Sequence, residues 1–365
     1  MKIIHTEASC GWGGQEIRIL EESRGLIQRG HEVSVACPAH ARMAAEAARF
    51  GVPVTALPIE FKTIAGLRAL RCHLAAARPD VVNTHSSADP WLVALACATL
   101  TSPPAIVRTR HISAPVAGNF ANRWLYRQAR AVATTGESLR RHLLDTLDLD
   151  PERVTSVPTG IDTERVSPVS SAADKAAAKT ALGLDQNKIH IGIVATLRSW
   201  KGHLYLLDAF AQLQRPDLQL VIVGEGPMRE PITEKIAALG LGDRVTLAGQ
   251  RTDPERWLQA MDVFCLPSYA NEGVPQAILQ AMLCALPIVT TPVGSILEAV
   301  SDGETALVVP PKDATALAAA ISRLLDDPAL AAHLGDHARR VASADFSKDT
   351  MLDRMETLFR QARSS

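Results

Sequence analysis

The sequence predicts an α/β protein with two doubly wound domains, each a parallel sheet covered by helices on both faces, that face each other across a central cleft. Three observations lead to this prediction. Short β-branched runs alternate with helical patterns through most of the chain. The alternation is interrupted once, at residues 163–188, and then restarts. The length of 365 residues fits two domains of roughly 150 to 200 residues each.

In the first half, strands are expected where β-branched residues cluster. They are KIIHT (2–6), EVSVA (32–36), PVTAL (53–57), DVVNTH (80–85), AIVRTRH (105–111), AVATT (131–135) and RVTSVP (153–158). A helical pattern lies between each consecutive pair, and the first covers about Gln15 to Arg29. Strands with such short apolar runs, separated by helices, are typical of a parallel sheet.

The interrupting segment, TERVSPVSSAADKAAAKTALGLDQNK, has Pro, Ser and an Ala/Lys helix but no strand, so a domain boundary is expected there. The second set of strands is HIGIVATL (190–197), LQLVIVGEG (218–226), RVTLAGQ (244–250), DVFCLPS (262–268), LPIVTTP (286–292) and ALVVPP (306–311). We expect a first domain over residues 1–165 and a second over 166–345. We also expect a C-terminal helix over about 346–365 that packs back on the first domain.

Composition favours a globular protein. With 38 basic and 39 acidic residues and 47% hydrophobic residues, the chain is neither disordered nor suited to coating nucleic acid. Six cysteines lack a CxxC pair or metal-ligand spacing, which predicts free thiols and a cytoplasmic location. The N-terminus has no signal-peptide core, and no apolar run reaches the roughly 18 residues that span a bilayer. Any membrane contact is therefore expected to be peripheral, on the inner face of the plasma membrane.

Polar and glycine-rich segments follow the expected strands, at the edge where open parallel sheets bind ligands. These segments are CGWGGQE, THSS, RTRHIS, TLRSWKG, GEGP and SYANEGVP, and we expect one cleft to collect them. Glu272 stands beside a helix start, whose unpaired N–H groups can bind phosphate while Gly273 lets an anion approach. Lys201 and Arg198 would complete a diphosphate clamp with this turn. Separately, each feature is equally typical of an ordinary helix start or glycine turn.

The order and spacing of these segments resemble the retaining nucleotide-sugar glycosyltransferases of family four (glycosyl transferases group 1), which have the GT-B fold of two Rossmann-like domains. The strongest match is NEGVPQAILQAMLCALPIVTTPVGSILEAVSDGETALVVPPKD, residues 271–313. Supporting matches are GWGGQE, GHEVSV, RPDVVNTHS, VPTGID, WKG, LVIVGEGP, VTLAGQ and DVFCLPS. The resemblance covers nearly the whole chain. It implies a first domain that binds the acceptor and a second that binds the donor.

The resemblance also implies roles for particular residues. The residues expected to act in catalysis are His111, Lys201 and Glu272. Those expected to bind the donor are Gly13, Gly14, Arg198, Lys201, Gly224, Glu225, Arg251, Glu272, Gly273, Val274 and Gln280. Glu272 would bind hydroxyls of the donor sugar, Lys201 a phosphate, and His111 would lie near the reacting sugar.

The chain departs from the family pattern at three positions. Gln280 replaces the second acid of the E-x7-E element, which keeps hydrogen bonding to ribose hydroxyls but removes the charge. Thr196 stands where the family has an arginine, and we expect Arg198 to supply the guanidinium instead. Thr159 stands where the family often has asparagine, so the hydrogen bond of that side chain is open.

The reaction implied is transfer of a sugar from a nucleoside diphosphate, with UDP favoured, to an acceptor hydroxyl with retention of anomeric configuration. No cofactor or metal is expected, because cationic residues and helix ends can stabilise the departing diphosphate. The only D-x-D pair, Asp148-Leu149-Asp150, is interpreted as a solvated turn.

The expected first domain is the basic part of the chain. Residues 42–141 contain 13 Lys/Arg and 5 Asp/Glu, a balance of +8. Arg123, Arg127 and Arg130 lie in NRWLYRQAR and could bind anionic lipid or a phosphorylated acceptor, or simply form a solvated helix face. We favour a glycan or lipid-linked acceptor of bacterial envelope polysaccharide or lipopolysaccharide synthesis, with peripheral membrane contact and no nucleic acid partner.

Three other functions stay open. A sugar-nucleotide epimerase of GT-B-like fold would bind the same donor but needs an acid/base pair that the sequence does not indicate. A nicotinamide dehydrogenase needs G-x-G-x-x-G after the first strand, which GWGGQEI lacks. A non-catalytic sugar-nucleotide-binding protein would share the clamp, and assay of donor hydrolysis distinguishes it from an enzyme.

Overall fold

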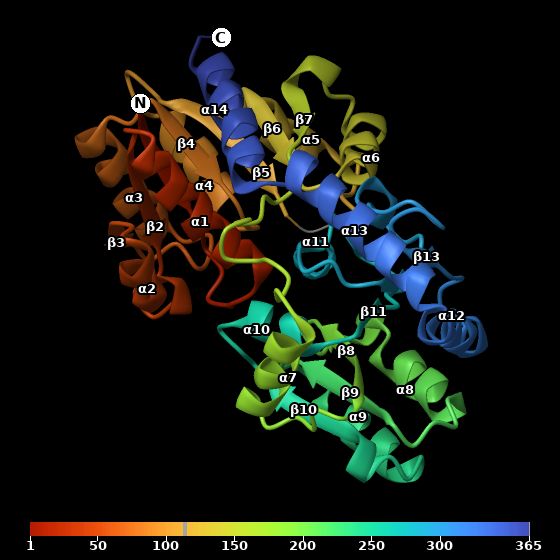
Figure 1. Cartoon of the computed structure of the whole chain (residues 1–365). Coiled ribbons are helices and arrows are strands. Elements are labelled where there is room, and N and C mark those ends of the chain that lie inside the picture. The colour runs from red at the N-terminus through yellow and green to blue at the C-terminus, as the bar shows by residue number, and fades with distance from the viewer. Residues whose placement is uncertain (112–114, 365) are drawn as a thin grey trace. The chain divides into compact units, whose positions relative to one another are not determined.

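The computed structural model describes residues 1–111 and 115–364 and divides into two compact units (Figure 1). Unit 1 comprises residues 1–160 and the C-terminal helix from residue 348, and unit 2 comprises residues 161–347. The divisions therefore fall at 160/161 and 347/348, where the sequence places them at 165/166 and 345/346.

Unit 1 contains a parallel seven-stranded sheet in the order β3-β2-β1-β4-β5-β6-β7. Its strands are β1 (Lys2–Thr6), β2 (Glu32–Cys37), β3 (Val54–Ala56), β4 (Val81–Thr84), β5 (Ala105–Arg110), β6 (Ala131–Thr134) and β7 (Val154–Ser156). Its helices are α1 (Gly14–Gln28), α2 (Arg42–Glu46), η1 (Ala47–Phe50), α3 (Ile64–Ala77), α4 (Asp89–Cys97), α5 (Phe120–Gln128), α6 (Glu137–Leu147), η2 (Pro151–Arg153) and α14 (Lys348–Ser364). The strand order reverses between β1 and β4, which is the position where doubly wound sheets bind ligands.

Unit 2 repeats this plan with a parallel six-stranded sheet in the order β10-β9-β8-β11-β12-β13. Its strands are β8 (Ile189–Val194), β9 (Leu218–Val223), β10 (Val245–Gly249), β11 (Val263–Leu266), β12 (Ile288–Thr290) and β13 (Leu307–Val308). Its helices are α7 (Ala172–Ala181), η3 (Ser199–Lys201), α8 (His203–Gln212), α9 (Arg229–Ala238), η4 (Gly242–Arg244), α10 (Pro254–Ala260), α11 (Gln276–Leu283), η5 (Ile296–Glu298), α12 (Ala314–Asp326) and α13 (Pro328–Asp345). The prediction of a two-domain, doubly wound α/β fold is confirmed.

Both faces of the unit 1 sheet are buried, which is why neighbouring residues of one strand are both apolar. Ile4 of β1 packs in a cluster with α3, α4 and α6, whereas Ile3 packs in another with α14. Helix α14 lies along the sheet of unit 1 in Figure 1, where Met351 and Phe359 contact the strands. A Cβ on Gly25 would lie 2.4 Å from Leu352 Cδ1, so α1 and α14 approach closely.

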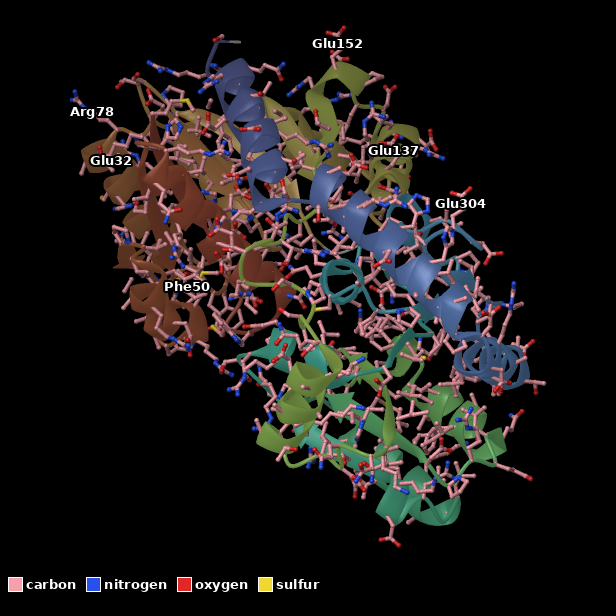
Figure 2. All side chains as sticks on the ribbon, in the orientation of Figure 1. Glu32, Phe50, Arg78, Glu137, Glu152 and Glu304 are labelled. Atoms are coloured by element: carbon pink, nitrogen blue, oxygen red, sulfur yellow. The ribbon has the colours of Figure 1, made fainter. Side chains whose placement is uncertain are left out.

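Charged side chains cover the outside of each unit. Glu32, Arg78 and Glu152 of unit 1, labelled in Figure 2, are exposed, and Glu304 is exposed in unit 2. Of the helices in the described part of the chain, none is long and apolar enough to cross a bilayer.

Candidate active site

The carboxyl ends of β8 and β11 lie side by side in unit 2, because these two strands pair in parallel. The segment after β8 carries Lys201 and the segment after β11 carries Glu272. Tyr269 N donates to Trp200 O at 2.8 Å, and a Cβ on Gly202 would lie only 2.0 Å from Pro267 O. The two segments are thus held together by backbone contacts next to both side chains.

Lys201 and Glu272 form an ion pair. Lys201 Nζ donates to Glu272 Oε1 at 2.6 Å, and Ser268 Oγ donates to the same oxygen at 2.6 Å. The side chains are 17% and 5% exposed. An ammonium has three donors, so Lys201 keeps two for a ligand such as phosphate. Both bonds to the carboxylate use Oε1, so within residues 1–111 and 115–364 Oε2 keeps its capacity to accept from a hydroxyl.

The turn that holds Glu272 is fixed by tight backbone packing. Asn271 has φ 57°, and Ser295 N donates to Glu272 O at 3.2 Å. Gly294, with φ 61°, stands so close that a Cβ there would lie 2.0 Å from Glu272 O. Only glycine fits at that position without moving the backbone of Glu272.

Helix α11 begins just after this turn. It starts at Gln276 rather than at Pro275, because Pro275 keeps an extended ψ of 125° and forms the N-cap. Gly273 N and Val274 N donate no hydrogen bond within the described residues. Two backbone donors at a helix start, beside a lysine, form an arrangement that is typical of phosphate sites.

Gln280, in the second turn of α11, is buried with 8% of its surface exposed, so it is more enclosed than a residue on a cleft wall.

The other residues expected to bind the donor contact residues of their own segments. Arg198 lies over the Trp200 ring at 5.8 Å, and Arg251 lies over Trp257 at 5.0 Å. Glu225 forms an ion pair with Arg229 at 2.9 Å. The structure brings together Lys201, Glu272, Gly273 and Val274. Arg198 contacts this group through its backbone, since Lys201 N donates to Arg198 O at 3.2 Å, but its guanidinium lies over Trp200. The side chains of Glu225 and Arg251 contact Arg229 and Trp257 instead.

Gly224 and a buried histidine shape the same edge of unit 2. Gly224 has φ 149°, and a Cβ there would lie 1.8 Å from Ala195 O, so the segments after β8 and β9 touch through their backbones. His203, at the start of α8, is buried beside Lys201. Burial and the Lys201 charge lower the pKa of His203 to about 4, so this imidazole stays neutral and adds no charge to the site.

In unit 1, three histidines form a hydrogen-bonded chain at the carboxyl ends of β1, β4 and β5. His5 Nδ1 lies 2.9 Å from His85 Nε2, and His85 Nδ1 lies 2.8 Å from His111 Nε2. Burial and the charge of Arg18 lower the pKa of His5 to about 3. The pKa values of His85 and His111 also lie well below the ordinary value, mainly because of burial. All three imidazoles are therefore neutral, and the nitrogen that accepts in each N–H···N bond lacks a proton.

The chain of imidazoles favours one arrangement of protons. His5 Nε2 is buried without a partner in the described structure, and an unpaired acceptor costs less there than an unpaired N–H. His5 Nδ1–H then donates to His85, and His85 Nδ1–H donates to His111. This tautomer leaves His111 with its proton on Nδ1, as a neutral donor at the end of β5. Ile112 and Ser113, also in the expected RTRHIS segment, lie outside the described residues.

Two buried carboxyl groups lie at the same edge of unit 1. Glu7 accepts from Ser9 N at 2.7 Å and Gln15 Nε2 at 2.5 Å. Asp89 accepts from Thr6 Oγ1 at 2.8 Å and His85 N at 2.9 Å. Burial, with the charge of Asp89, raises the pKa of Glu7 to about 8. Burial thus favours the protonated form of Glu7 at neutral pH, beside the buried Asp89 and its hydrogen-bond donors.

Arg18, Gly13 and Gly14 lie at the start of α1. Arg18 is buried, and its Nη1 donates to Val157 O at 2.8 Å and to Thr159 Oγ1 at 3.2 Å. Thr159, which replaces the asparagine common in the family, thus accepts a hydrogen bond within unit 1. Gly13 is the N-cap of α1 and Gly14 its first residue. A Cβ on Gly13 would meet only Glu16 Oε2, at an ordinary 3.7 Å, so this backbone has open space beside it.

The arginines of α5, Arg123 and Arg127, and Arg130 just after it contact other groups of unit 1. Arg123 Nε donates to Gly118 O at 3.2 Å, and Arg130 Nη1 donates to Ala362 O at 3.2 Å. Arg127 is exposed and lies 4.0 Å from the carboxylate of Asp148. Asp148 is the left-handed C-cap of α6, and Asp150 caps η2. The D-x-D pair is therefore occupied in capping a turn.

Sequence reasoning did not single out the buried groups at the edge of unit 1. They are His5, Glu7, Arg18, His85 and Asp89. The signal was present in part, because KIIHTE and NTHSSADP place polar residues at the ends of apolar strands. Nothing in those segments shows that the side chains turn inward and bond to one another across three strands.

Two family models together match most of the chain. The model described as Glycosyl transferases group 1 matches residues 174–341, and Glycosyltransferase Family 4 matches residues 12–165. The Alpha-D-kanosaminyltransferase of Streptomyces kanamyceticus is 30% identical over 290 residues, which cover 78% of this chain and 70% of that protein. The lipopolysaccharide core biosynthesis mannosyltransferase LpsB of Rhizobium meliloti is 36% identical over 183 residues, which cover 47% of this chain and 51% of that protein.

A solved structure supports the fold. Anabaena HepE in complex with UDP-glucose matches with a TM-score of 0.83 at 22% identity, covering 98% of this chain and 99% of the other. The family models, the relatives and the two doubly wound units agree with the resemblance seen in the sequence. The chain therefore belongs to the group 1 glycosyltransferases and has their two-domain GT-B fold.

Proposed function

We propose that this glycosyltransferase moves a hexosyl group from a nucleoside-diphosphate sugar to a hydroxyl of a glycan or lipid-linked acceptor, with retention of anomeric configuration and without a metal ion. The observation that carries the proposal is the Lys201–Glu272 pair beside Gly273 N and Val274 N. A cation and two backbone donors suit a phosphate. A fixed carboxylate oxygen suits the hydroxyls of the attached sugar.

The donor proposed is a UDP-sugar, with GDP-mannose as the second choice. HepE, which shares the fold, has been crystallised with UDP-glucose, and LpsB is a mannosyltransferase. Glu272 would bind sugar hydroxyls through Oε2, and Lys201 would bind the phosphate next to the sugar. Gln280 would contact the ribose only if its buried amide turns toward the ligand, so it is the weakest member of the proposed donor site.

Departure of the diphosphate is the step that these groups would assist. As the bond between the anomeric carbon and the phosphate oxygen breaks, negative charge grows on the phosphate. Lys201 and the N–H groups at the start of α11 would stabilise that charge, at a few kcal/mol for each well-placed donor. This assistance is electrostatic, and we therefore propose that a divalent cation is not needed.

Retention would follow from attack on the same face of the sugar. The acceptor oxygen forms the new bond to the anomeric carbon, and its proton passes to the departing phosphate oxygen. In this proposal no protein carboxylate becomes glycosylated. His111, a neutral donor on Nδ1, would orient a hydroxyl of the reacting sugar.

The acceptor proposed is a lipid-linked glycan of the bacterial envelope. LpsB, which acts in lipopolysaccharide core biosynthesis, supports an envelope role. An exposed aromatic patch on unit 1 supports contact with the membrane that carries such an acceptor, on the cytoplasmic face. Phe61, Ile64 and Phe120 are exposed, Phe120 by 85%. Trp91 stacks on Trp124 at 5.8 Å and Lys62 lies over Trp91 at 5.2 Å.

We define this aromatic patch by four aromatic residues and one aliphatic residue, which are Phe61, Ile64, Trp91, Phe120 and Trp124. The patch extends from the start of α3 across α4 to α5. Phe120 and Trp124 stand one turn apart on α5, on the face next to Arg123 and Arg127. Aromatic side chains with basic neighbours are typical of surfaces that lie on anionic lipid. Since Arg123 and Arg130 bond to backbone carbonyls, Arg127 and Lys62 are the basic groups most available to lipid.

The experiment is a thermal-shift screen against UDP-, GDP-, ADP- and dTDP-sugars, followed by assay of nucleoside diphosphate release with a lipid-linked glycan. We expect stabilisation by one class of donor, release that depends on acceptor, and an anomeric configuration in the product equal to that of the donor. Binding without release would favour a sugar-nucleotide-binding protein. Interconversion of the sugar without transfer would favour an epimerase.

Metal dependence is tested in the same assay with EDTA. We expect donor binding and turnover to continue. Loss of activity that Mg²⁺ or Mn²⁺ restores would contradict the metal-free mechanism.

Membrane contact is tested with Phe120→Ser combined with Arg127→Gln. The pair should weaken binding to vesicles containing anionic lipid and transfer to a lipid-linked acceptor, while leaving donor hydrolysis unchanged. The matched control is Leu297→Ser with Arg78→Gln, which replaces an exposed apolar residue and an exposed arginine elsewhere. Equal vesicle binding by the two double variants would show that the arginines of α5 do not bind lipid and belong to an ordinary solvated helix face.

A further inference from the structure

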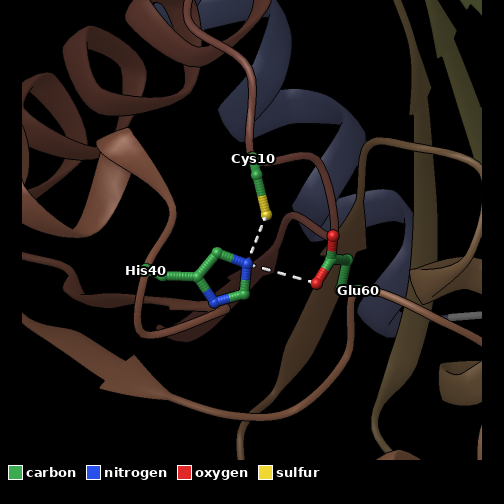
Figure 3. Close-up of side chains that lie close together, drawn as sticks. All are labelled: Cys10, His40 and Glu60. Atoms are coloured by element: carbon green, nitrogen blue, oxygen red, sulfur yellow. Dashed lines mark hydrogen bonds and ion pairs between the residues drawn. The ribbon is translucent and has the colours of Figure 1, made fainter.

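Three loops at the carboxyl edge of unit 1 bring together Cys10, His40 and Glu60. Cys10 follows β1, His40 follows β2 and Glu60 follows β3, and these three strands are neighbours in the sheet. Figure 3 shows the three side chains pointing toward one another. Cys10 Sγ lies 3.3 Å from His40 Nε2, which lies 3.2 Å from Glu60 Oε2, and the three atoms lie within 4.8 Å of one another.

One nitrogen serves both contacts in this cluster. A neutral imidazole nitrogen either donates through its hydrogen or accepts through its lone pair, so Nε2 cannot bond well to both partners at once. A metal ion placed among the three atoms would accept a lone pair from each of them. From this convergence we propose that Cys10, His40 and Glu60 bind one zinc ion, with a fourth position open to water.

Two of the three separations between these atoms fit tetrahedral zinc, and the third lies within 4.8 Å. Zinc lies about 2.3 Å from a thiolate sulfur, about 2.0 Å from an imidazole nitrogen and about 2.1 Å from a carboxylate oxygen, so neighbouring ligands in a tetrahedron stand about 3.4 to 3.6 Å apart. The two contacts of His40 Nε2, at 3.3 and 3.2 Å, are close to these values. Small side-chain movements would therefore complete the coordination.

The ligand types select the ion. Thiolate and imidazole favour zinc over magnesium or calcium, which prefer oxygen ligands. The His40 side chain is 67% exposed, so the site is open to ions from solution.

A zinc ion here would tie the loop before α1 to the loops after β2 and β3. Cys10 stands three residues before Gly13, so the ion would fix the segment that leads into α1. The proposal does not depend on the proposed function, because neither the zinc nor its ligands take part in the steps given there.

The experiment uses the full-length protein freed of metal by chelation. Titration with Zn²⁺ should load one ion per chain and raise the melting temperature. Titration with Co²⁺ should give the near-ultraviolet charge-transfer band of a cobalt–thiolate bond. Cys10→Ser should abolish the cobalt band, and His40→Ala and Glu60→Gln should each weaken zinc binding at least about tenfold, since three ligands leave little redundancy.

Two control variants make the test specific. Cys72→Ser replaces another accessible cysteine and should keep both the band and the bound zinc. His333→Ala removes a histidine that stands one turn from His337 on α13, a pair that can take up metal without a thiolate, and it should also keep the band. A cobalt–thiolate band of native strength in Cys10→Ser, or zinc uptake by native protein no greater than by His40→Ala, would overturn the proposal.

Discussion

The two units share one topology but carry opposite chemistry at the carboxyl ends of their strands. Both sheets have the reversal of strand order that marks a ligand site, between β1 and β4 in unit 1 and between β8 and β11 in unit 2. In unit 1, that edge holds three neutral histidines and a Glu7 carboxyl whose pKa is raised to about 8. In unit 2 it holds the Lys201–Glu272 ion pair and the Gly273 and Val274 N–H groups, which donate no hydrogen bond in the described part of the chain.

This difference shows that two sheets of the same topology can differ in the charge that they carry at the carboxyl ends of their strands. Burial in unit 1 keeps the three histidines and Glu7 neutral, because an ion in a low-dielectric interior is costly unless it is paired, as Arg18 is with Glu22. Unit 2 keeps charge by pairing Lys201 with Glu272 at a partly exposed position. An edge that keeps charge is suited to stabilising a departing phosphate, whereas a neutral edge is suited to orienting hydroxyls.

The largest effect is expected from removing the cation of unit 2. Lys201→Ala should lower the rate of transfer at least about a hundredfold, because one donor to a developing charge is worth about that much. The matched control is Lys235→Ala, which breaks an ion pair with Asp208 at 2.7 Å in the same unit. A near-normal rate in Lys201→Ala, or an equal loss of rate in Lys235→Ala, would show that Lys201 does not act in the proposed donor site.

A second substitution disturbs the Glu272 turn through its backbone. Gly294→Ala places a Cβ 2.0 Å from Glu272 O, and we expect it to weaken donor binding at least about tenfold and to cost about 1 to 3 kcal/mol of unfolding free energy. Gly240→Ala is the control, since Gly240 has a similar φ of 66° but open space around it. It should cost only the left-handed strain, about 1 kcal/mol. Equal donor affinity in the two variants would show that the turn is not part of the site.

The neutral edge of unit 1 predicts a pH dependence of stability. The pKa of Glu7 rises from 4.5 to about 8 on folding. Its stabilising contribution is therefore complete below about pH 4.5 and is lost as the pH rises through about 8. The histidines have lowered pKa values and act in the opposite direction, but only below about pH 6.5. Burial also raises the pKa of the neighbouring Asp89, so Glu7 is isolated by comparing the native protein with Glu7→Gln from about pH 6.5 to 8.

In that window, the free energy of unfolding of the native protein should fall relative to that of Glu7→Gln, by on the order of 1 kcal/mol per pH unit. Urea unfolding at several pH values measures both slopes. Glu32→Gln, which changes an exposed carboxylate, should follow the native protein. Parallel slopes for the native protein and Glu7→Gln would mean that Glu7 is ionised in the folded state.

The sequence predicted the strands and their positions along the chain well, but the ends of several strands differ in the structure. DVVNTH was expected to pair over residues 80–85, and β4 covers Val81–Thr84. At the end of the strand, His85 N donates to the Asp89 side chain rather than to a neighbouring strand. At its start, Asp80 N still donates to Lys2 O at 2.8 Å, and the Asp80 side chain accepts from Lys2 N in addition. β-branched patterns carry no record of such side-chain bonds.

The sequence singled out candidate site residues where a local pattern existed. Lys201 and Glu272 stand 71 residues apart, but each lies in a glycine-containing turn after a strand, and the structure pairs them. Cys10, His40 and Glu60 have no such pattern, because their spacings of 30 and 20 residues reflect only the order of β1, β2 and β3. Such clusters become visible only when the strand order is known.

The most direct test of the charged edge of unit 2 is a pair of calorimetric titrations on native protein and Glu272→Gln. One uses the nucleoside diphosphate, and the other uses the nucleoside-diphosphate sugar, its sugar ester. The account assigns phosphate binding to Lys201 and backbone N–H groups, and sugar binding to the Glu272 carboxylate. Glu272→Gln should therefore bind the diphosphate within about threefold of native and the sugar ester at least about tenfold more weakly, a loss of about 1.4 kcal/mol. Equal affinity of the two proteins for the sugar ester would contradict the account.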